Sequence, residues 1–256
     1  AKPAKRELLL VEIKNLIGEA PENRNYGINR IQTALEQRGK KVSLRTVYRT
    51  MNEGGLVHKR RIPHGITKAT DEEQKAENII KRDFTAEKPV TKLLSDITEV
   101  PYKDGKLYVS PVLDCFNGEI VALEIRDNMK KELCVDTVKQ LKYRYGNLNG
   151  VILHTDRGSQ YTSDLFRSIL SRYGIIQSLS STGKCFDNSR MESFFATLKK
   201  EKLYQIPTYK MTKKEVKTII YRYIFGYYNT IRVNSFNPGG WPPSVYRKMC
   251  EGEIAA

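Results

Sequence analysis

Residues 93–127, LLSDITEVPYKDGKLYVSPVLDCFNGEIVALEIRD, decide the fold. This stretch contains three runs with the composition of β-strands: LLSDITEV, KLYVSPVLDCF and EIVALEIRD. Lys103-Asp104-Gly105 separates the first run from the second, and Asn117-Gly118 separates the second from the third. Because such glycine-containing pairs form tight hairpin turns, the stretch predicts a three-stranded antiparallel meander.

A helix and a further strand follow the meander. Lys131 to Tyr145 carries apolar residues at helical spacing, and VILHTD at 151–156 has the pattern of a short buried strand. Three strands, a helix and a fourth strand is the order of the ribonuclease-H-like core. We therefore predict an α/β fold with this core, built as a mixed five-stranded sheet with helices and preceded by an N-terminal helical domain.

Three helices are predicted in that N-terminal domain. Residues 5–17 place apolar side chains on one helical face, and residues 27–38 do so before Gly39 ends the helix. Ser43 is placed to cap a third helix. Helix, short glycine-containing turn and helix is the helix-turn-helix pattern, which places its second helix in the DNA major groove. On the third helix we expect Leu44, Val47 and Met51 to face inward, and the outward, DNA-contacting residues to be Arg45, Arg49 and Asn52.

The charge of the chain indicates a polyanionic partner. The sequence holds 44 Lys and Arg against 29 Asp and Glu, a net charge of +15, and residues 1–61 hold 14 Lys and Arg against 6 Glu. The alternative is a generally basic, solvated surface on a small helical bundle. Because the local charge coincides with the helix-turn-helix pattern, we favour nucleic acid as the partner.

Composition also limits the class of protein. No run approaches the roughly 18 apolar residues of a membrane span, and the N-terminus has no signal sequence, so we expect a cytoplasmic protein. The four cysteines form no C-x-x-C pair, which argues against a zinc site or a disulfide framework. Neither a Walker A sequence for ATP nor a G-x-S-x-G hydrolase elbow is present.

Changes in composition along the chain predict four consecutive parts. These are a helix-turn-helix-like DNA-binding domain, a linker or bridging arm, the catalytic core and a helical C-terminal extension, at 1–57, 58–89, 90–205 and 206–256. The arm mixes many charges with prolines and has a short helical pattern only from about Asp71 to Lys81. In the extension, residues 213–231 carry a helical apolar stripe, and the prolines and glycines from Pro238 to Pro243 are expected to end the regular structure.

Three acidic residues could carry chemistry. Asp96 lies in the middle of the first strand run, Asp156 at the end of the fourth, and Glu192 in the first turns of a helix that Asp187 can cap. An acid on an apolar strand is costly unless it is paired, hydrogen-bonded or bound to a metal. The alternative for Asp96 is a pair with a neighbouring lysine or a cap on the strand end. Glu192 borders an apolar stripe on its helix, and Lys199 projects from nearly the same side two turns later. The stripe consists of Met191, Phe194, Phe195 and Leu198.

Three carboxylates suit phosphodiester chemistry. Two Mg²⁺ ions held about 3.5 to 4 Å apart can activate the attacking oxygen and stabilise the leaving oxygen of an in-line displacement. Carboxylate oxygens prefer Mg²⁺ or Mn²⁺ to zinc. The sequence therefore predicts two Mg²⁺ ions, with Mn²⁺ able to substitute, at Asp96, Asp156 and Glu192.

Six motifs, in order, resemble one family. They are YGINRIQTALEQRGKKVSLRTVYRTM, SDITEV, HTDRGSQYTS, STGKCFDNSRMESFFATLKKE, YIFGYYNTIR and WPPSVY, between about Tyr26 and Tyr246. Over this length the chain is similar to the large reading-frame transposases of bacterial insertion sequences, whose core resembles that of retroviral integrases. The 35 residues between Asp156 and Glu192 match the spacing for which this Asp, Asp, Glu family is named.

The resemblance implies a metal-dependent transposase that cleaves the 3′ ends of an insertion sequence and transfers them to target DNA. It implies that Asp96 and Asp156 bind metal and that Glu192 completes the site. The residues expected to line the DNA path are His154, Arg157, Asn188 and Lys199.

The expected partners follow from that reaction. They are the terminal inverted repeats and target DNA, a second copy of the chain on paired ends, and the helix-turn-helix and leucine-zipper product of an upstream reading frame. The protein is expected in the bacterial cytoplasm, at the nucleoid. Two alternatives are a DNA-binding regulator or inactive domesticated relative, against which the intact carboxylates count, and another ribonuclease-H-like nuclease, against which the basic N-terminus and the late motifs count.

Overall fold

The chain forms two compact units in a computed structural model that describes residues 5–57, 78–180 and 188–254. The first, which we call the sheet unit, comprises residues 67–226. The second, the terminal unit, combines residues 1–66 with residues 227–256. This grouping differs from four consecutive parts, because the residues after Gly226 group with the first helices of the chain.

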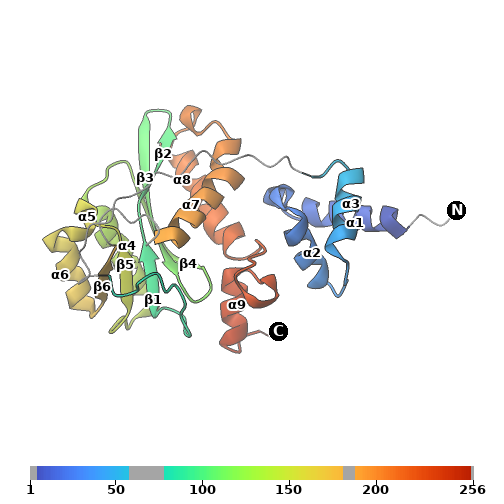
Figure 1. Cartoon of the computed structure of the whole chain (residues 1–256). Coiled ribbons are helices and arrows are strands. Elements are labelled where there is room, and N and C mark those ends of the chain that lie inside the picture. Colours follow the sequence, from blue (N-terminus) through green and yellow to red (C-terminus); the bar gives the residue numbers. More distant parts are fainter. Residues whose placement is uncertain (1–4, 58–77, 181–187, 255–256) are drawn as a thin grey trace. The chain divides into compact units, whose positions relative to one another are not determined.

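The sheet unit is built around a mixed sheet that has six strands among the described residues, where five were predicted (Figure 1). Its strands are β1 (Lys92–Ser95), β2 (Thr98–Tyr102), β3 (Gly105–Asp114), β4 (Ile120–Arg126), β5 (Ile152–Thr155) and β6 (Ile176–Leu179). β3 pairs antiparallel with β1, β2 and β4, and β5 pairs parallel with β1 and β6. The predicted meander and fourth strand are confirmed, and β6 adds the last strand of the sheet.

The first predicted strand is interrupted. β1 pairs with the end of β3, where Leu94 lies opposite Leu113, and β2 pairs with the start of β3, where Thr98 lies opposite Val109. Asp96 therefore follows directly after β1, and its expected position in the middle of a strand is wrong. A carboxylate inside the ladder would have been held among apolar side chains, whereas the break leaves it at the edge of the sheet.

Helices cover the sheet. They are α4 (Lys131–Tyr145), α5 (Ser159–Thr162), α6 (Asp164–Tyr173), α7 (Ser189–Glu201) and α8 (Lys213–Tyr221). Figure 1 shows α5 and α6 on one side of the sheet and α7 and α8 on the other. The core beneath α4 and α6 includes Leu93, Val112, Leu141, Leu153 and Phe166, all buried. Burial of each such side chain stabilises the fold by about 1.5–3 kcal/mol.

The helices after the core differ in part from those predicted. The four residues of the expected apolar stripe on α7 are all buried, which confirms that face. Two 3-10 turns, η3 (Leu203–Gln205) and η4 (Thr208–Lys210), join α7 to α8. The helix predicted over residues 213–231 is α-helical to Tyr221 and continues as a π-helix, η5 (Arg222–Tyr228).

The terminal unit begins with the three predicted helices. They are α1 (Lys5–Gly18), α2 (Ile28–Glu36) and α3 (Leu44–Glu53), with a 3-10 turn, η1 (Pro21–Asn25), after α1. The Thr46 N–H donates to the Ser43 hydroxyl, so Ser43 caps α3 as predicted. Val47 and Met51 are buried, but Leu44 is 44% exposed, so its expected inward position is wrong. Leu44 is the first residue of α3, where no preceding helical turn covers it.

The last residues of the chain complete the terminal unit. The Val233 N–H donates to Tyr26 Oη at 2.8 Å, and Tyr227 Oη donates to Asn23 Oδ1 at 3.2 Å. All four residues are buried. The 3-10 turn η6 (Pro238–Gly240) and helix α9 (Pro243–Cys250) follow. The expected end of regular structure near Pro243 is therefore wrong, because proline at the first position of a helix needs no N–H donor.

Two expectations concern the arm and membrane spans. Of the short helix predicted from Asp71 to Lys81, residues 71–77 lie outside the described residues, and residues 78–81 are not helical. Lys81 and Arg82 have φ values of 45° and 66°, which a right-handed helix excludes.

Within the described ranges, no helix is both long and apolar enough to cross a lipid bilayer.

Candidate active site

Two aspartates meet at one edge of the sheet because of strand direction. β1 and β5 are parallel neighbours, with Leu94 opposite His154, so their carboxyl ends lie at the same edge. Asp96 follows the end of β1 and Asp156 follows the end of β5. Two acids that are 60 positions apart in the sequence thereby become neighbours in the structure.

Each aspartate is held by a nearby backbone N–H. The Ile97 N–H donates to Asp96 Oδ1 at 2.7 Å, and the Gly158 N–H donates to Asp156 Oδ1 at 2.9 Å. A Cβ on Gly158 would lie 3.0 Å from Asp156 Oδ1, so a side chain at this position would press against the carboxylate. Sequence reasoning did not single out this glycine, although its place two residues after the acid was the available signal.

Glu192 reaches the site from α7, which contacts β1. Arg190 holds the start of this helix: its Nη1 donates to the carbonyl oxygens of Phe84 and Cys115, both at 2.8 Å. Asn188 occupies the N-cap position of α7, and the predicted cap, Asp187, lies outside the described residues. The role of Arg190 had no sequence signal, because its partners are backbone atoms 75 and 106 positions away.

The charges of the three acids act on one another. Burial raises the pKa of Asp96 to about 7, and the charges of Asp156 and Glu192 contribute to the rise. The Ile97 N–H and the nearby Asn188 amide oppose it. Asn188 is buried, yet neither atom of its amide reaches hydrogen-bond geometry within the described chain. The site therefore brings three acids together around Asp96, whose charge is poorly hydrated.

The donor set fits a hard divalent cation. All three groups are carboxylates, and oxygen ligands of this kind suit Mg²⁺ or Mn²⁺. The pKa of Asp96 is raised first by burial and then by the like charges of Asp156 and Glu192, and a bound cation would offset both effects. The three carboxylates are neighbours rather than a closed ligand shell, since among the residues that the structure describes no group of three or more His, Cys, Asp or Glu has metal-binding spacing.

The residues expected along the DNA path differ in their positions. Arg157 and Lys199 are half-buried, and Arg157 Nε donates to the Ser180 carbonyl oxygen at 2.9 Å. His154 is fully buried, and its two ring nitrogens bond the hydroxyls of Ser178 and Ser180 at 2.9 and 3.1 Å. His154 therefore joins β5 to β6 and does not line a DNA surface. The sequence did not reveal this burial, because the hydroxyl partners of His154 lie on and after β6.

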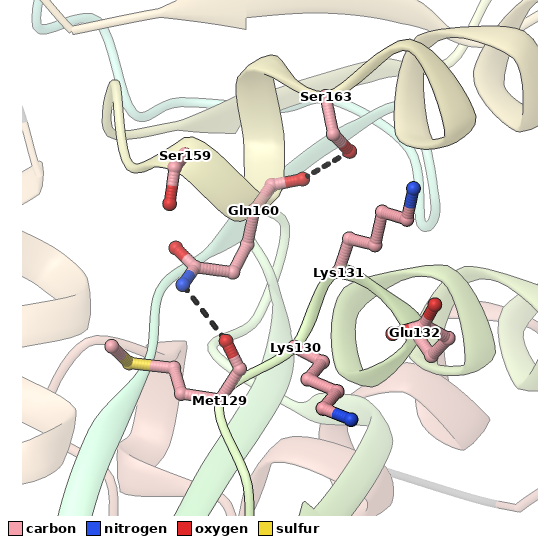
Figure 2. Close-up of a pocket in the computed structure, with 7 residues that line it drawn as sticks. All are labelled: Met129, Lys130, Lys131, Glu132, Ser159, Gln160 and Ser163. Atoms are coloured by element: carbon pink, nitrogen blue, oxygen red, sulfur yellow. Dashed lines mark hydrogen bonds between the residues drawn. The ribbon is translucent and has the colours of Figure 1, made fainter.

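A hollow lined by two lysines and one glutamate, Glu132, lies at the same sheet edge (Figure 2). β4 runs parallel to β1, since both are antiparallel to β3, so the start of α4 emerges at the edge that carries the acids. The hollow has a volume of about 360 Å³ between α4 and α5. Gln160 Nε2 donates to the Met129 carbonyl oxygen at 2.9 Å and bridges its two walls (Figure 2). Lys130 and Lys131 line it, and sequence reasoning had not selected them.

In the terminal unit, the predicted base-contacting residues share one exposed surface. Arg45, Arg49 and Asn52 are all exposed on α3, opposite the buried Val47 and Met51. This arrangement agrees with a helix whose outer face is available to a partner.

Known protein families match a segment of each of the two units. Residues 86–185 match the integrase core domain, and residues 4–64 match an HTH-like domain. The chain is 33% identical over 231 residues to the transposase for insertion sequence element IS904 of Lactococcus lactis, covering 90% of each chain. It is 32% identical over 240 residues to InsK of insertion sequence element IS150 of Escherichia coli K12, covering 93% of this chain and 83% of that protein. Among solved structures it is similar to the catalytic core domain of BIV integrase, at 16% identity and a TM-score of 0.47, covering 64% and 97% of the two chains. On the sequence relationships, which extend over most of both chains, this protein belongs to the family of insertion-sequence transposases with an integrase core domain.

Proposed function

We propose that this protein is an active DNA transposase that cleaves phosphodiester bonds at the ends of an insertion sequence and joins the resulting 3′ ends to target DNA. The observation that carries the proposal is the meeting of Asp96, Asp156 and Glu192, from β1, β5 and α7, with the pKa of Asp96 raised by burial and by the two other acids. Like charges gathered around a half-buried carboxylate are costly for folding, which favours a functional reason for them.

Asp96, Asp156 and Glu192 would hold two Mg²⁺ ions, with Mn²⁺ able to substitute. When bound, such ions stabilise the attacking and leaving oxygens of an in-line displacement at phosphorus. Asp96 must release its proton to serve as a ligand, which its pKa of about 7 permits near neutral pH. The Ile97 and Gly158 N–H groups orient the two aspartates for that role.

The reaction exchanges one phosphoester bond for another and needs no nucleophile from the protein. In the first step water attacks the phosphorus at the element end and the bond to the 3′ oxygen breaks, leaving a 3′ hydroxyl. In the second step this hydroxyl attacks a phosphodiester of the acceptor strand, whose own 3′ oxygen leaves. The task of the protein is therefore to position two DNA strands and to balance charge.

Basic groups beside the acids are placed to hold the DNA backbone. Arg157 directly follows Asp156, Lys199 lies two turns after Glu192 on α7, and Lys130 and Lys131 line the hollow at the same sheet edge. Asn188 faces Asp96 inside the site. Phosphate contacts of this kind fix position without reading sequence.

The terminal unit would recognise the terminal repeats through Arg45, Arg49 and Asn52 in the major groove. Two element ends must be joined in one reaction, so at least two copies are expected on paired ends. The helix-turn-helix and leucine-zipper product of an upstream frame would assist recognition. The protein would act on DNA at the bacterial nucleoid.

The test is a cleavage assay on the two ends of the element that carries the gene. The chain is incubated with Mg²⁺ and end-labelled duplex, with and without the upstream-frame product, and the strands are separated on a denaturing gel. Nicked and strand-transferred products that disappear with Asp156→Asn are expected. Specific binding to the ends without any cleavage, even with the upstream product present, would instead establish a regulator.

A further inference from the structure

Two exposed tyrosines lie on the connection between α7 and α8. Tyr204 on η3 is 71% exposed and Tyr209 on η4 is 60% exposed. The Lys210 ammonium lies 5.7 Å from the centre of the Tyr209 ring. Together with neighbouring lysines they form what we call the tyrosine platform, defined as Lys200, Tyr204, Tyr209, Lys210 and Lys214. We propose that this platform binds an unpaired strand of DNA beside the cleavage site, with bases stacked on the rings and phosphates near the lysines.

The tyrosines project from a fixed frame. Leu203 and Thr208, which immediately precede them, are both buried. Gln205 Nε2 donates to the Lys200 carbonyl oxygen at 3.0 Å, and the Lys103 N–H donates to the Met211 carbonyl oxygen at 2.9 Å. The backbone around both rings is therefore anchored, and the outward position of the rings is a property of the fold. A prearranged ring loses little conformational freedom when a ligand binds it.

The segment that carries the rings is rich in lysine, although one of its lysines, Lys213, pairs with Asp127 at 2.7 Å. Residues 199–217 contain seven Lys and two Glu. Glu201 is buried and accepts a hydrogen bond from Tyr223 Oη at 2.9 Å. Glu215 accepts one from the Thr212 N–H at 2.8 Å in the capping box of α8. Both acids thus serve internal contacts, while the three lysines of the platform are exposed to an anionic partner.

Exposed rings favour unpaired over paired DNA. Lysines alone suffice for duplex phosphates, and the faces of duplex bases are covered by their neighbours in the stack. An unpaired base has a free face, and stacking on an aromatic side chain is tolerant of base identity. Each tyrosine would also remove apolar ring area from water on binding.

Tyr204 lies just past the end of α7, and Glu192 is in the first turn of the same helix. Twelve residues separate Glu192 from Tyr204, about 18 Å at 1.5 Å per residue, and most of this length is α7. That distance corresponds to about five stacked nucleotides. The inference rests on the proposed function, since it takes the carboxylates as the cleavage site, and it adds the strand that emerges beside them.

The test measures affinity without cleavage. Binding of a fluorescent oligothymidylate of about 15 nucleotides to the full chain is followed by anisotropy in EDTA. Replacing both tyrosines, Tyr204→Ala with Tyr209→Ala, should weaken binding at least about tenfold. Tyr204→Phe with Tyr209→Phe should bind as the wild type does, because phenylalanine retains the stacking face. Tyr143→Ala, which removes a 94% exposed tyrosine from α4, is the matched control and should also bind normally.

Three results would overturn the platform. The first is unchanged oligothymidylate affinity in the double alanine variant, and the second is an equal loss in Tyr143→Ala. The third is an equal loss of affinity for duplex DNA or for a strand without bases, which would mean that only phosphates are bound. The binding assay in EDTA is independent of cleavage. A protein that does not nick DNA could therefore still bind through the platform, and a protein that nicks DNA could still lack the platform. Thermal melting confirms that the variants fold.

Discussion

The two units of this protein are assembled from the sequence in different ways. In the sheet unit, two acids become neighbours because β1 and β5 are adjacent parallel strands within one continuous segment. In the terminal unit, the first helices are completed by the last residues, and the bonded pair Tyr26 and Val233 is separated by 207 positions. The proposed catalytic site should therefore respond to changes at one sheet edge, and the proposed DNA-binding helices to changes at the opposite end of the chain.

The largest expected effect is on catalysis in the sheet unit. Asp156→Asn should reduce nicking of element ends at least about a thousandfold, roughly 4 kcal/mol in the barrier, because it removes a charge that the cations need. End binding and the melting temperature should remain close to those of the wild type. Asp164→Asn, an exposed acid at the start of α6, is the control and should nick normally in the gel assay. Full activity of Asp156→Asn would exclude this site.

The next effect should separate the units. Gly240 has a φ of 72°, and a Cβ there would lie 2.3 Å from Thr33 Cγ2 and 3.3 Å from Val233 Cγ1. Gly240→Ala combines backbone strain with a clash and should destabilise the terminal unit by about 2–4 kcal/mol. Hydrogen exchange followed by mass spectrometry should show faster exchange in α2 and unchanged exchange in β1 and β5.

Gly27→Ala is the matched control for that experiment. Gly27 has a φ of −84°, and nothing lies within 4 Å of its added Cβ. It should leave exchange in α2 nearly unchanged. If Gly240→Ala also leaves α2 protected, the C-terminal segment is not part of the core of the terminal unit.

The sheet unit was largely predictable because its signals are local. Strand runs separated by Asn117-Gly118 and Lys103-Asp104-Gly105 fix a meander, and the order of elements fixes the rest. The proximity of Asp96 and Asp156 follows from that order. The break after Ser95 was missed, because periodicity cannot tell one long strand from two short ones that pair with the two ends of β3.

In the terminal unit, local sequence patterns predict the helices but not the contacts between the two ends of the chain. Helical spacing predicted α1 to α3 and the Ser43 cap, but nothing in the sequence joins Tyr26 to Val233. Such contacts are made by a backbone N–H, which every residue except proline has, and so they leave no residue pattern. Burial of His154 was missed for a related reason. Its partners, Ser178 on β6 and Ser180 just after β6, lie 24 and 26 positions away in the sequence.

A smaller effect should appear in the pH dependence of stability. The pKa of Asp96 is raised from an ordinary 3.8 to about 7, so the folded state binds this proton more tightly than the unfolded state. Protonated Asp96 therefore contributes to the free energy of unfolding. This contribution is fully present below about pH 4 and is lost as the pH rises through about 7. The full rise corresponds to roughly 4 kcal/mol, but Asp96 is only partly buried and solvent screens its charge. In EDTA, Asp96→Asn should therefore stabilise the protein by about 2 kcal/mol at pH 8 and have little effect at pH 4.

Urea unfolding at both pH values measures this difference. In the wild type at pH 8, added Mg²⁺ should raise stability, because a cation that binds only the folded state favours it. Asp96→Asn should respond less to Mg²⁺. An asparagine variant that is destabilised equally at pH 4 and pH 8 would mean that the carboxylate is needed for packing rather than held in an unfavourable charged state.

The smallest effect tests one bond between the two ends of the chain. Tyr26→Phe removes the oxygen that accepts the Val233 N–H at 2.8 Å and leaves a buried donor without its partner. The expected cost is about 1–2 kcal/mol in the terminal unit, measured by urea unfolding. Tyr48→Phe, on a 46% exposed tyrosine of α3, loses a hydroxyl that water can replace and should cost almost nothing. Equal stabilities of the two variants would mean that water also serves the Val233 N–H, so the first helices would not depend on the end of the chain through this bond.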